Sequence, residues 1–277
     1  MLKDILAHIP ADDRDGGVIA CAVSAARLFN AHLDGLSGPG ISVHPAIALG
    51  ASSAALAITA ENDPAVARAT AALDHLEAAA KAAEVRLGEL TVCDSPYPAH
   101  QRMAELARLY DLNILAQPDR SRPRSGDAVL ESILIQSGRP LLVVPYIFKG
   151  ALKLDRVLLC WDGGRRAARA LHDSMPLLQR AKAVTIVTVN ETLPDTDRLS
   201  STALSEHLAR GGINASALRI TAEKPEIHGA ILSLAADDGA DLIVMGGYDH
   251  SRLRERAFGG VTRGMLETMT VPVFMSH

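Results

Sequence analysis

The chain of 277 residues is longer than a usual single domain of about 100 to 200 residues, which predicts two compact units. Its net charge is -4 and its arginines are interspersed with acids, so the composition excludes the basic face of a nucleic-acid-binding protein. Aromatic residues make up 3% and hydrophobic residues 48%, which indicates closely packed helices on a sheet.

Five short apolar runs in the first half predict strands, at residues 4–9, 31–36, 86–92, 112–116 and 140–145. After the first run, apolar residues recur at helical spacing: Val18, Cys21, Ala22, Ala25, Leu28 and Phe29. Segment 35–60 carries no formal charge, but its glycines, prolines and serines favour a loop and a buried alanine-rich turn over a membrane span.

The second half repeats this alternation. Its apolar runs predict strands at residues 156–160, 183–189, 213–220, 241–245 and 271–275. The intervening segments predict helices at residues 165–181, 195–212 and 226–240. Pro176 predicts a kink or an early end in the first of these helices, and glycines end the other two.

The two halves align as an internal duplication. "DLNILAQPDRS" from Asp111 matches "DLIVMGGYDHS" from Asp241 at an offset of 130, and Pro140 matches Pro272 at an offset of 132. The second copy is therefore two residues longer inside a glycine-containing loop. We expect domains at residues 1–147 and 152–277.

Strands that alternate with helices predict right-handed crossovers and a parallel sheet covered on both faces. Each domain should be a doubly wound, five-stranded α/β unit with probable strand order 3-2-1-4-5. In such sheets ligands bind beyond the carboxyl ends of the strands, so the loops after strands one and four are the candidate site.

In the second half these two loops contain "CWDGG" and "MGGYDHS". Glycines allow backbone N–H groups to approach a ligand, and "GGVTR" opens the last predicted helix, whose N-terminus favours anions. Arg252, Arg254, Arg256 and Arg263 either neutralise phosphate or form a solvated charge run. Asp162 either caps the following helix, contacts a ligand, or does both.

These residues make the whole chain resemble two tandem copies of the universal stress protein family, whose fold is adenine-nucleotide α-hydrolase-like. In the family's nucleotide-binding motif after strand four, Gly246, Gly259, Val261 and Thr262 match in spacing. Asp249 stands where a second glycine is expected, next to Gly247, and Gly260 replaces a hydroxyl residue. The resemblance also aligns Asp162 with an aspartate beside the adenine and ribose, and Val189 with a backbone position that reads the adenine.

The resemblance implies a stress-response protein that binds an adenine nucleotide in its second domain as a sensor or switch. ATP is the expected ligand, with ADP or AMP as alternatives and Mg accompanying the nucleotide. The implied binding residues are Asp162, Val189, Gly246, Gly247, Arg252, Gly259, Gly260, Val261 and Thr262.

The first copy lacks the motif, because Ala116, Asp119, Asp127 and Ala128 stand at its aligned positions. We expect no nucleotide there. Family domains pair through their last strands, so the resemblance implies that the first copy is a built-in partner of the second. A homodimer and an unidentified protein partner are further expectations.

Other chemistries lack their motifs. Asp249, His250 and Ser251 are consecutive and cannot form a hydrolase triad. P-loop and dinucleotide glycine patterns are absent, and no histidine or cysteine spacing indicates a metal site. We expect no catalytic residue and at most a slow ATPase.

Two alternatives to nucleotide binding stay open. One is a family member that binds no nucleotide and acts through protein partners; the other is an enzyme of the related folds, which would need a Ser-Gly-Gly loop after strand one. Three dispersed cysteines and a start, "MLKDILAHIP", without a signal-peptide core favour the cytoplasm.

Overall fold

The computed structural model describes residues 1–11, 16–38, 64–92, 99–118, 126–247 and 260–277. Most of the uncharged segment 35–60 lies outside these ranges. Among the described residues, no helix has both the length and the apolar character that a membrane span requires.

The first half alternates strands and helices as its apolar runs predict. Its elements are β1 (Asp4–Pro10), α1 (Gly17–Phe29), β2 (His32–Gly38), α4 (Pro64–Ala82), β3 (Leu87–Val92), α5 (Ala99–Leu106), η1 (Ala107–Leu109), β4 (Leu112–Ala116), α6 (Gly126–Gln136) and β5 (Leu141–Val144). The apolar positions that predicted α1 face inward, and Cys21, Ala22 and Ala25 are fully buried.

The second half has the same order. Its elements are β6 (Arg156–Cys160), α7 (Arg165–Leu178), β7 (Ala183–Val189), α8 (Ser201–Arg210), β8 (Ala215–Ile220), η2 (Lys224–Glu226), α9 (Ile227–Asp238), β9 (Leu242–Gly246), α10 (Gly260–Thr268) and β10 (Val273–Ser276). Pro176 lies inside α7, which ends two residues later. The predicted helix 195–212 begins only at residue 201, because the Ser200 hydroxyl accepts the Ala203 N–H and caps it there.

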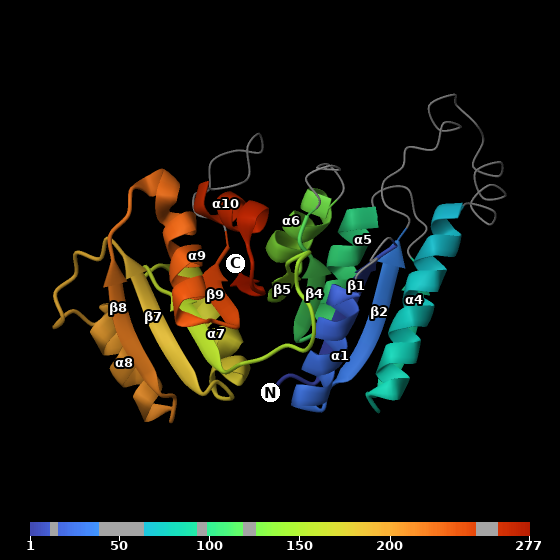
Figure 1. The fold of residues 1–277 in the computed structure, drawn as a ribbon, viewed down its shortest axis with the longest axis horizontal. Coiled ribbons are helices and arrows are strands. Elements are labelled where there is room, and N and C mark those ends of the chain that lie inside the picture. The colour runs from blue at the N-terminus through green and yellow to red at the C-terminus, as the bar shows by residue number, and fades with distance from the viewer. Residues whose placement is uncertain (12–15, 39–63, 93–98, 119–125, 248–259) are drawn as a thin grey trace. The chain divides into compact units, whose positions relative to one another are not determined.

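Both halves have the predicted strand order, 3-2-1-4-5. The first is β3-β2-β1-β4-β5 and the second is β8-β7-β6-β9-β10 (Figure 1). The pairs of β1 with β2 and β4, and of β6 with β7 and β9, are parallel. The doubly wound α/β fold expected from the sequence is confirmed.

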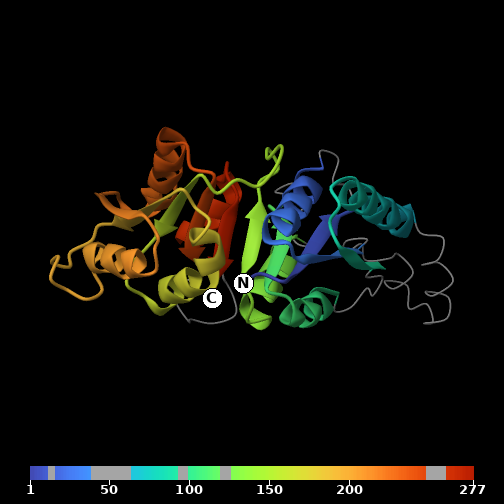
Figure 2. The same ribbon diagram turned by 90° about the horizontal axis from the view of Figure 1, so that it is seen from below.

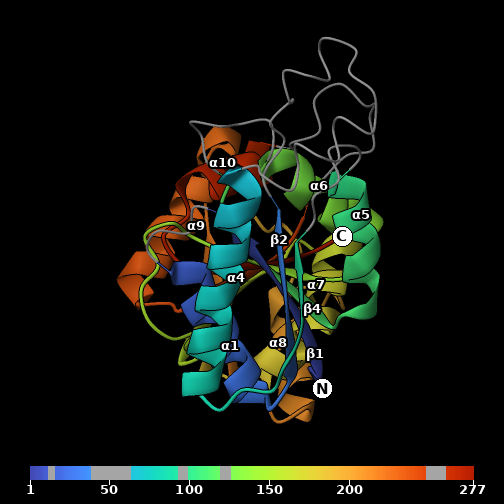
Figure 3. The same cartoon turned by 90° about the vertical axis from the view of Figure 1, so that its right-hand side faces the viewer.

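Helices cover both faces of each sheet, so the inner strands are buried on both sides, whereas the residues of the edge strands β3 and β8 are half-buried or exposed. In the first half α1 and α4 lie on one face and α5 and α6 on the other (Figures 2 and 3). In the second half α7 and α8 lie on one face, and α9 packs with α10 on the other (Figure 2). The strand interiors are accordingly apolar: Ile5, Ile114, Leu158 and Val244 are fully buried.

The chain forms two compact units, 1–139 with 149–151, and 140–148 with 152–277. The second unit takes in β5, the last strand of the first copy, because β5 pairs antiparallel with β10. Val143 lies opposite Val273, and Leu141 lies opposite Met275. The last strands of the two copies therefore pair, as the resemblance implied.

An aspartate clamp repeats in both copies and marks the duplication at the level of individual hydrogen bonds. Asp111 Oδ2 accepts the N–H groups of Lys3, at 2.7 Å, and Asp4, at 3.3 Å. Asp241 Oδ2 accepts the N–H groups of Asp155, at 2.9 Å, and Arg156, at 3.0 Å. Each carboxylate thus fixes the start of its first strand against its fourth.

Replacing Asp241 with alanine is expected to lower the free energy of unfolding by about 1 kcal/mol, because two N–H groups at the start of β6 lose their acceptor. Urea unfolding followed by circular dichroism measures the change. Asp237→Ala, on the exposed side of α9, is the matched control and should change stability by no more than a few tenths of a kcal/mol. Equal effects of the two variants would contradict a stabilising clamp.

Candidate functional site

The carboxyl ends of β6 and β9 lie side by side in the second unit. The two strands are parallel neighbours, and Leu159 lies opposite Val244. Asp162, two residues after β6, and the Gly246–Gly247 pair at the end of β9 therefore lie at the same edge of the sheet. The structure brings together these residues of the predicted site.

Asp162 is exposed and forms a tight turn before α7. Its Oδ1 accepts the N–H of Gly164 at 2.7 Å, and Gly163 between them has a positive φ of 72°. Gly164 is the N-cap of α7 and has no side-chain cap of its own. The turn-forming role of Asp162 is thus realised, and its carboxylate is still accessible at the edge of the sheet.

Val189 is the last residue of β7, the strand that neighbours β6. The Trp161 N–H donates to the Val187 carbonyl at 2.9 Å, so the backbone groups of Val187 point toward β6. Along a strand this orientation of the backbone N–H and C=O groups repeats every second residue. The backbone groups of Val189 therefore point the same way, toward the space beyond Trp161. The next residue, Asn190, has φ 57° and fixes the ends of β7 and β8 through a pair of hydrogen bonds with Ala222.

Gly246 packs against the first turn of α7. A Cβ atom on this residue would lie 2.8 Å from the carbonyl carbon and Cβ of Arg166 and 2.9 Å from the nitrogen of Ala167. The close approach of β9 to α7 is therefore sufficient to require glycine here. Gly247 is held by the next strand, since its N–H donates to the Ser276 carbonyl at 2.8 Å.

Gly260, Val261 and Thr262 form the first turn of α10, which lies at the carboxyl end of the strands in this unit (Figure 1). Gly260 is exposed, and no atom of the described residues lies within 4 Å of the position of a Cβ there. Thr262 is buried, with 4% of its surface exposed. Arg263 pairs with Glu267 one turn later, through Nε and Oε1 at 2.9 Å.

Other predicted residues fall outside the described part of the chain. Arg252, Arg254, Arg256, Gly259, Asp249 and His250 all lie in 248–259. In the first copy, Asp119 is likewise outside, whereas β1 ends at Pro10, at the position that aligns with Asp162. That edge of the first sheet carries no equivalent carboxylate on β1.

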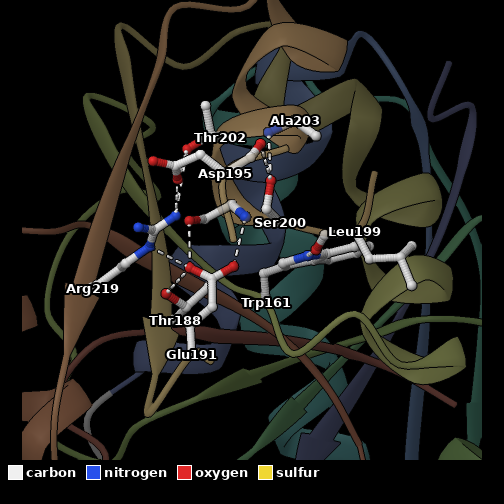
Figure 4. A network of polar contacts seen from close by, with 10 residues as sticks. Trp161, Thr188, Glu191, Asp195, Leu199, Ser200, Thr202, Ala203 and Arg219 are labelled. Carbon is white, nitrogen blue, oxygen red and sulfur yellow. Dashed lines mark hydrogen bonds and ion pairs between the residues drawn. The ribbon is translucent and has the colours of Figure 1, made fainter. Parts of the chain in front are cut away.

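A polar network that was not predicted from the sequence lies at the same edge. Arg219 on β8 donates from Nε to Glu191 Oε2 at 2.6 Å, and its Nη2 contacts Asp195 Oδ1 (Figure 4). Both acids lie between β7 and α8. The sequence does contain a signal for this network: two carboxylates follow β7, and an arginine lies near the end of the next strand, β8. The doubly wound strand order makes these two strands neighbours.

Trp161 connects this network to the site. Its indole is buried, with 9% exposed, and Nε1 donates to the Leu199 carbonyl at 2.8 Å (Figure 4). The preceding Cys160 is no nucleophile, because burial and, secondarily, the charge of Asp162 raise the pKa of its thiol to about 12. Within the described ranges, no group of three or more His, Cys, Asp or Glu residues could hold a metal ion.

The fold and this edge define a class of protein, a tandem, doubly wound α/β protein with a candidate ligand site in its second copy. Residues 153–277 match the sequence model described as the Universal stress protein family. Universal stress protein Slr1230 from Synechocystis sp. is 27% identical over 148 residues, which are 53% of this chain and 50% of that protein. The chain thus spans about half the length of this curated relative.

Solved structures share the fold over nearly the whole chain. A universal stress protein from Archaeoglobus fulgidus is 17% identical, with a TM-score of 0.71 over 98% of this chain and 97% of that one. A functionally unknown protein from Pseudomonas aeruginosa, PA1789, is 16% identical, with a TM-score of 0.62 over 99% and 92%. The second copy is therefore similar in sequence to the universal stress protein family, and the whole chain shares the fold of these solved structures.

Proposed function

We propose that this protein acts in the stress response by binding an adenine nucleotide, ATP, in its second copy as a sensor or switch. The observation that carries the proposal is the convergence of Asp162, the backbone of Val189 and the Gly246–Gly247 pair at one edge of the sheet. The N-terminus of α10, which favours anions, would receive phosphates there. ADP or AMP could replace ATP, and Mg would accompany the phosphates.

The residues in this proposal divide by the part of the nucleotide they would meet. Asp162 and Val189 would contact the ribose and adenine, and Gly246, Gly247, Gly260, Val261 and Thr262 would surround the phosphates. Arg252 and Gly259 complete the proposed set from outside the described residues. No catalytic residue is assigned, so hydrolysis would be slow, and the expected compartment is the cytoplasm.

A family member that acts through protein partners is the second candidate function. Its support is that packing already explains Gly246 and that Asp162 already has a structural bond. Asp249 and Gly260 also depart from the family's nucleotide motif, and both departures favour a protein that binds no nucleotide. A homodimer would need a surface other than the edge of β10 that β5 occupies.

The single tryptophan of the chain provides a local test. With Mg present, ATP is expected to change the fluorescence of Trp161 and to raise the melting temperature, since a ligand at a hundredfold excess over Kd stabilises by about 2.7 kcal/mol. Mass spectrometry of the freshly purified protein would identify ATP, ADP or AMP carried through purification.

Asp162→Asn separates the turn from ligand binding, because the amide keeps an oxygen that can accept the Gly164 N–H. It should leave the melting temperature of the free protein unchanged and raise the Kd for ATP about tenfold. Asp237→Asn, on the exposed side of α9, is the control and should bind like the native chain. Absence of any ATP effect, with no co-purified nucleotide, would favour the partner-binding candidate.

A further inference from the structure

The segment between β7 and α8, residues 190–200, is bound at two points by one arginine of the neighbouring strand β8. Arg219 reaches Glu191 near the start of this segment and Asp195 in its middle (Figure 4). The Glu191 side chain is 5% exposed, and the Asp195 side chain is 63% exposed. One guanidinium thus spans a buried and a solvated carboxylate, which its planar array of donors suits.

Both oxygens of the Glu191 carboxylate accept hydrogen bonds within this unit. Oε1 accepts the Ser201 N–H at 2.8 Å, and Oε2 accepts the hydroxyls of Ser201, at 2.7 Å, and Thr188, at 3.1 Å. Burial raises the pKa of Glu191, but the hydrogen bonds from Ser201, Arg219 and Thr188 outweigh it and hold the pKa below its usual value. The carboxylate is therefore ionised at neutral pH and anchors the segment to the start of α8.

The far end of the segment lies across the loop that follows β6. The Leu199 carbonyl accepts the Trp161 indole N–H, and the Leu199 Cβ lies 3.6 Å from the position of a Cβ on Gly163. Asp162 stands between these two contacts in the chain. Asp162 is thus flanked on both sides by residues that contact the segment to which Arg219 binds.

We infer that Arg219 is a positioning residue for the nucleotide site: by binding Glu191 and Asp195, it holds segment 190–200 against Trp161 and Gly163 and so orders the adenine side of the site. This inference rests on the proposed function. Arg219 touches no proposed nucleotide contact itself, so its loss should act through the order of the segment.

The experiment compares Arg219→Gln and Arg219→Lys with the native chain. Acrylamide quenching of Trp161 in nucleotide-free protein reports release of the segment, and calorimetric titration with MgATP gives the Kd. Lys182→Gln is the matched control, since it removes a surface ion pair, Lys182 with Asp155, before the start of β7 at the opposite end of the sheet.

Loss of the guanidinium in Arg219→Gln is expected to raise the quenching constant about twofold and the Kd for ATP about fivefold. Arg219→Lys keeps the positive charge, so its quenching constant and its Kd for ATP should lie between those of Arg219→Gln and the native chain. If the substitutions only destabilised the fold, the two variants would change both quantities equally. Lys182→Gln should match the native chain in both measurements.

The outcomes separate this inference from the proposed function. Quenching in Arg219→Gln equal to that of the native chain overturns the inference whether or not ATP binds. Increased quenching with an unchanged Kd also overturns it, because the segment would then move without affecting the site. Failure of the native chain to bind ATP overturns the proposed function and, with it, the inference.

Discussion

Replacing Gly246 with alanine is expected to lower the free energy of unfolding of the second unit by about 3 kcal/mol. The added Cβ would lie 2.8 Å from two atoms of Arg166 and 2.9 Å from the backbone nitrogen of Ala167. Backbone atoms cannot rotate away as the end of a side chain can, so β9 and the first turn of α7 must separate. Urea unfolding followed by Trp161 fluorescence measures the loss, because this tryptophan lies in the same unit.

Gly260→Ala is the matched control in the same unit. Gly260 is exposed at the start of α10, and among the residues that the structure describes no atom lies within 4 Å of an added Cβ. Alanine favours the helix over glycine by up to about 1 kcal/mol, so this variant should be as stable as the native chain or slightly more so. A Gly246→Ala protein as stable as the native chain would show that β9 and α7 can separate without cost.

The contact between Gly246 and α7 limits what this glycine indicates about function. A glycine at this position matches the nucleotide motif, yet the close approach of α7 accounts for it without a ligand. Gly260 is the opposite case, since no atom of the described residues crowds it. The proposed nucleotide site therefore rests on the convergence of the carboxyl ends of β6, β7 and β9 rather than on any single glycine.

The sequence predicts the inner strands well because each is a short apolar run buried on both faces, and it finds the more exposed edge strands β3 and β8 from the repeated alternation of strands and helices. Its internal alignment at Asp111 and Asp241 also identifies a real structural equivalence, since both carboxylates clamp the start of a first strand. The end of α9 was equally predictable, because Gly239 adopts the left-handed conformation at its C-cap.

The start of α8 and its anchoring network could not be predicted from local patterns. Asp195 and Asp197 look like helix-starting residues, but Asp197 accepts the Leu199 N–H in a turn and Asp195 meets Arg219 from another strand. Arg219 lies 28 residues beyond Glu191 in sequence. A contact of this kind depends on strand order and register, so only the folded structure shows which carboxylates the arginine reaches.

Acid is expected to destabilise the first copy through a buried histidine. His8 on β1 is 7% exposed; its Nε2 lies 3.4 Å from Asn113 Oδ1, and within the described structure its Nδ1 has no hydrogen-bond partner. Burial lowers the pKa of His8 to about 4, and the hydrogen bond with Asn113 opposes this only in part. A proton on this ring would be buried without a second acceptor.

The direction of the pH effect on stability follows from the pKa of His8 in the unfolded and the folded chain. The unfolded chain binds a proton on His8 near its ordinary pKa of about 6.5, whereas the folded chain binds it only near 4. Stability is therefore lost as the pH falls from about 6.5 toward 4, and the full difference is worth about 3 kcal/mol. Between pH 7 and pH 4.5, His8 alone should account for a loss of about 2 kcal/mol.

His8→Gln isolates this contribution, because glutamine can still donate to Asn113 but does not titrate. Urea unfolding followed by circular dichroism at pH 7 and pH 4.5 should show a smaller acid loss in His8→Gln than in the native chain, by about 2 kcal/mol. His172→Gln, which changes an exposed histidine on α7, should retain the native acid loss. Equal acid losses in all three proteins would mean that protonation of His8 does not set the stability of the chain between pH 7 and pH 4.5.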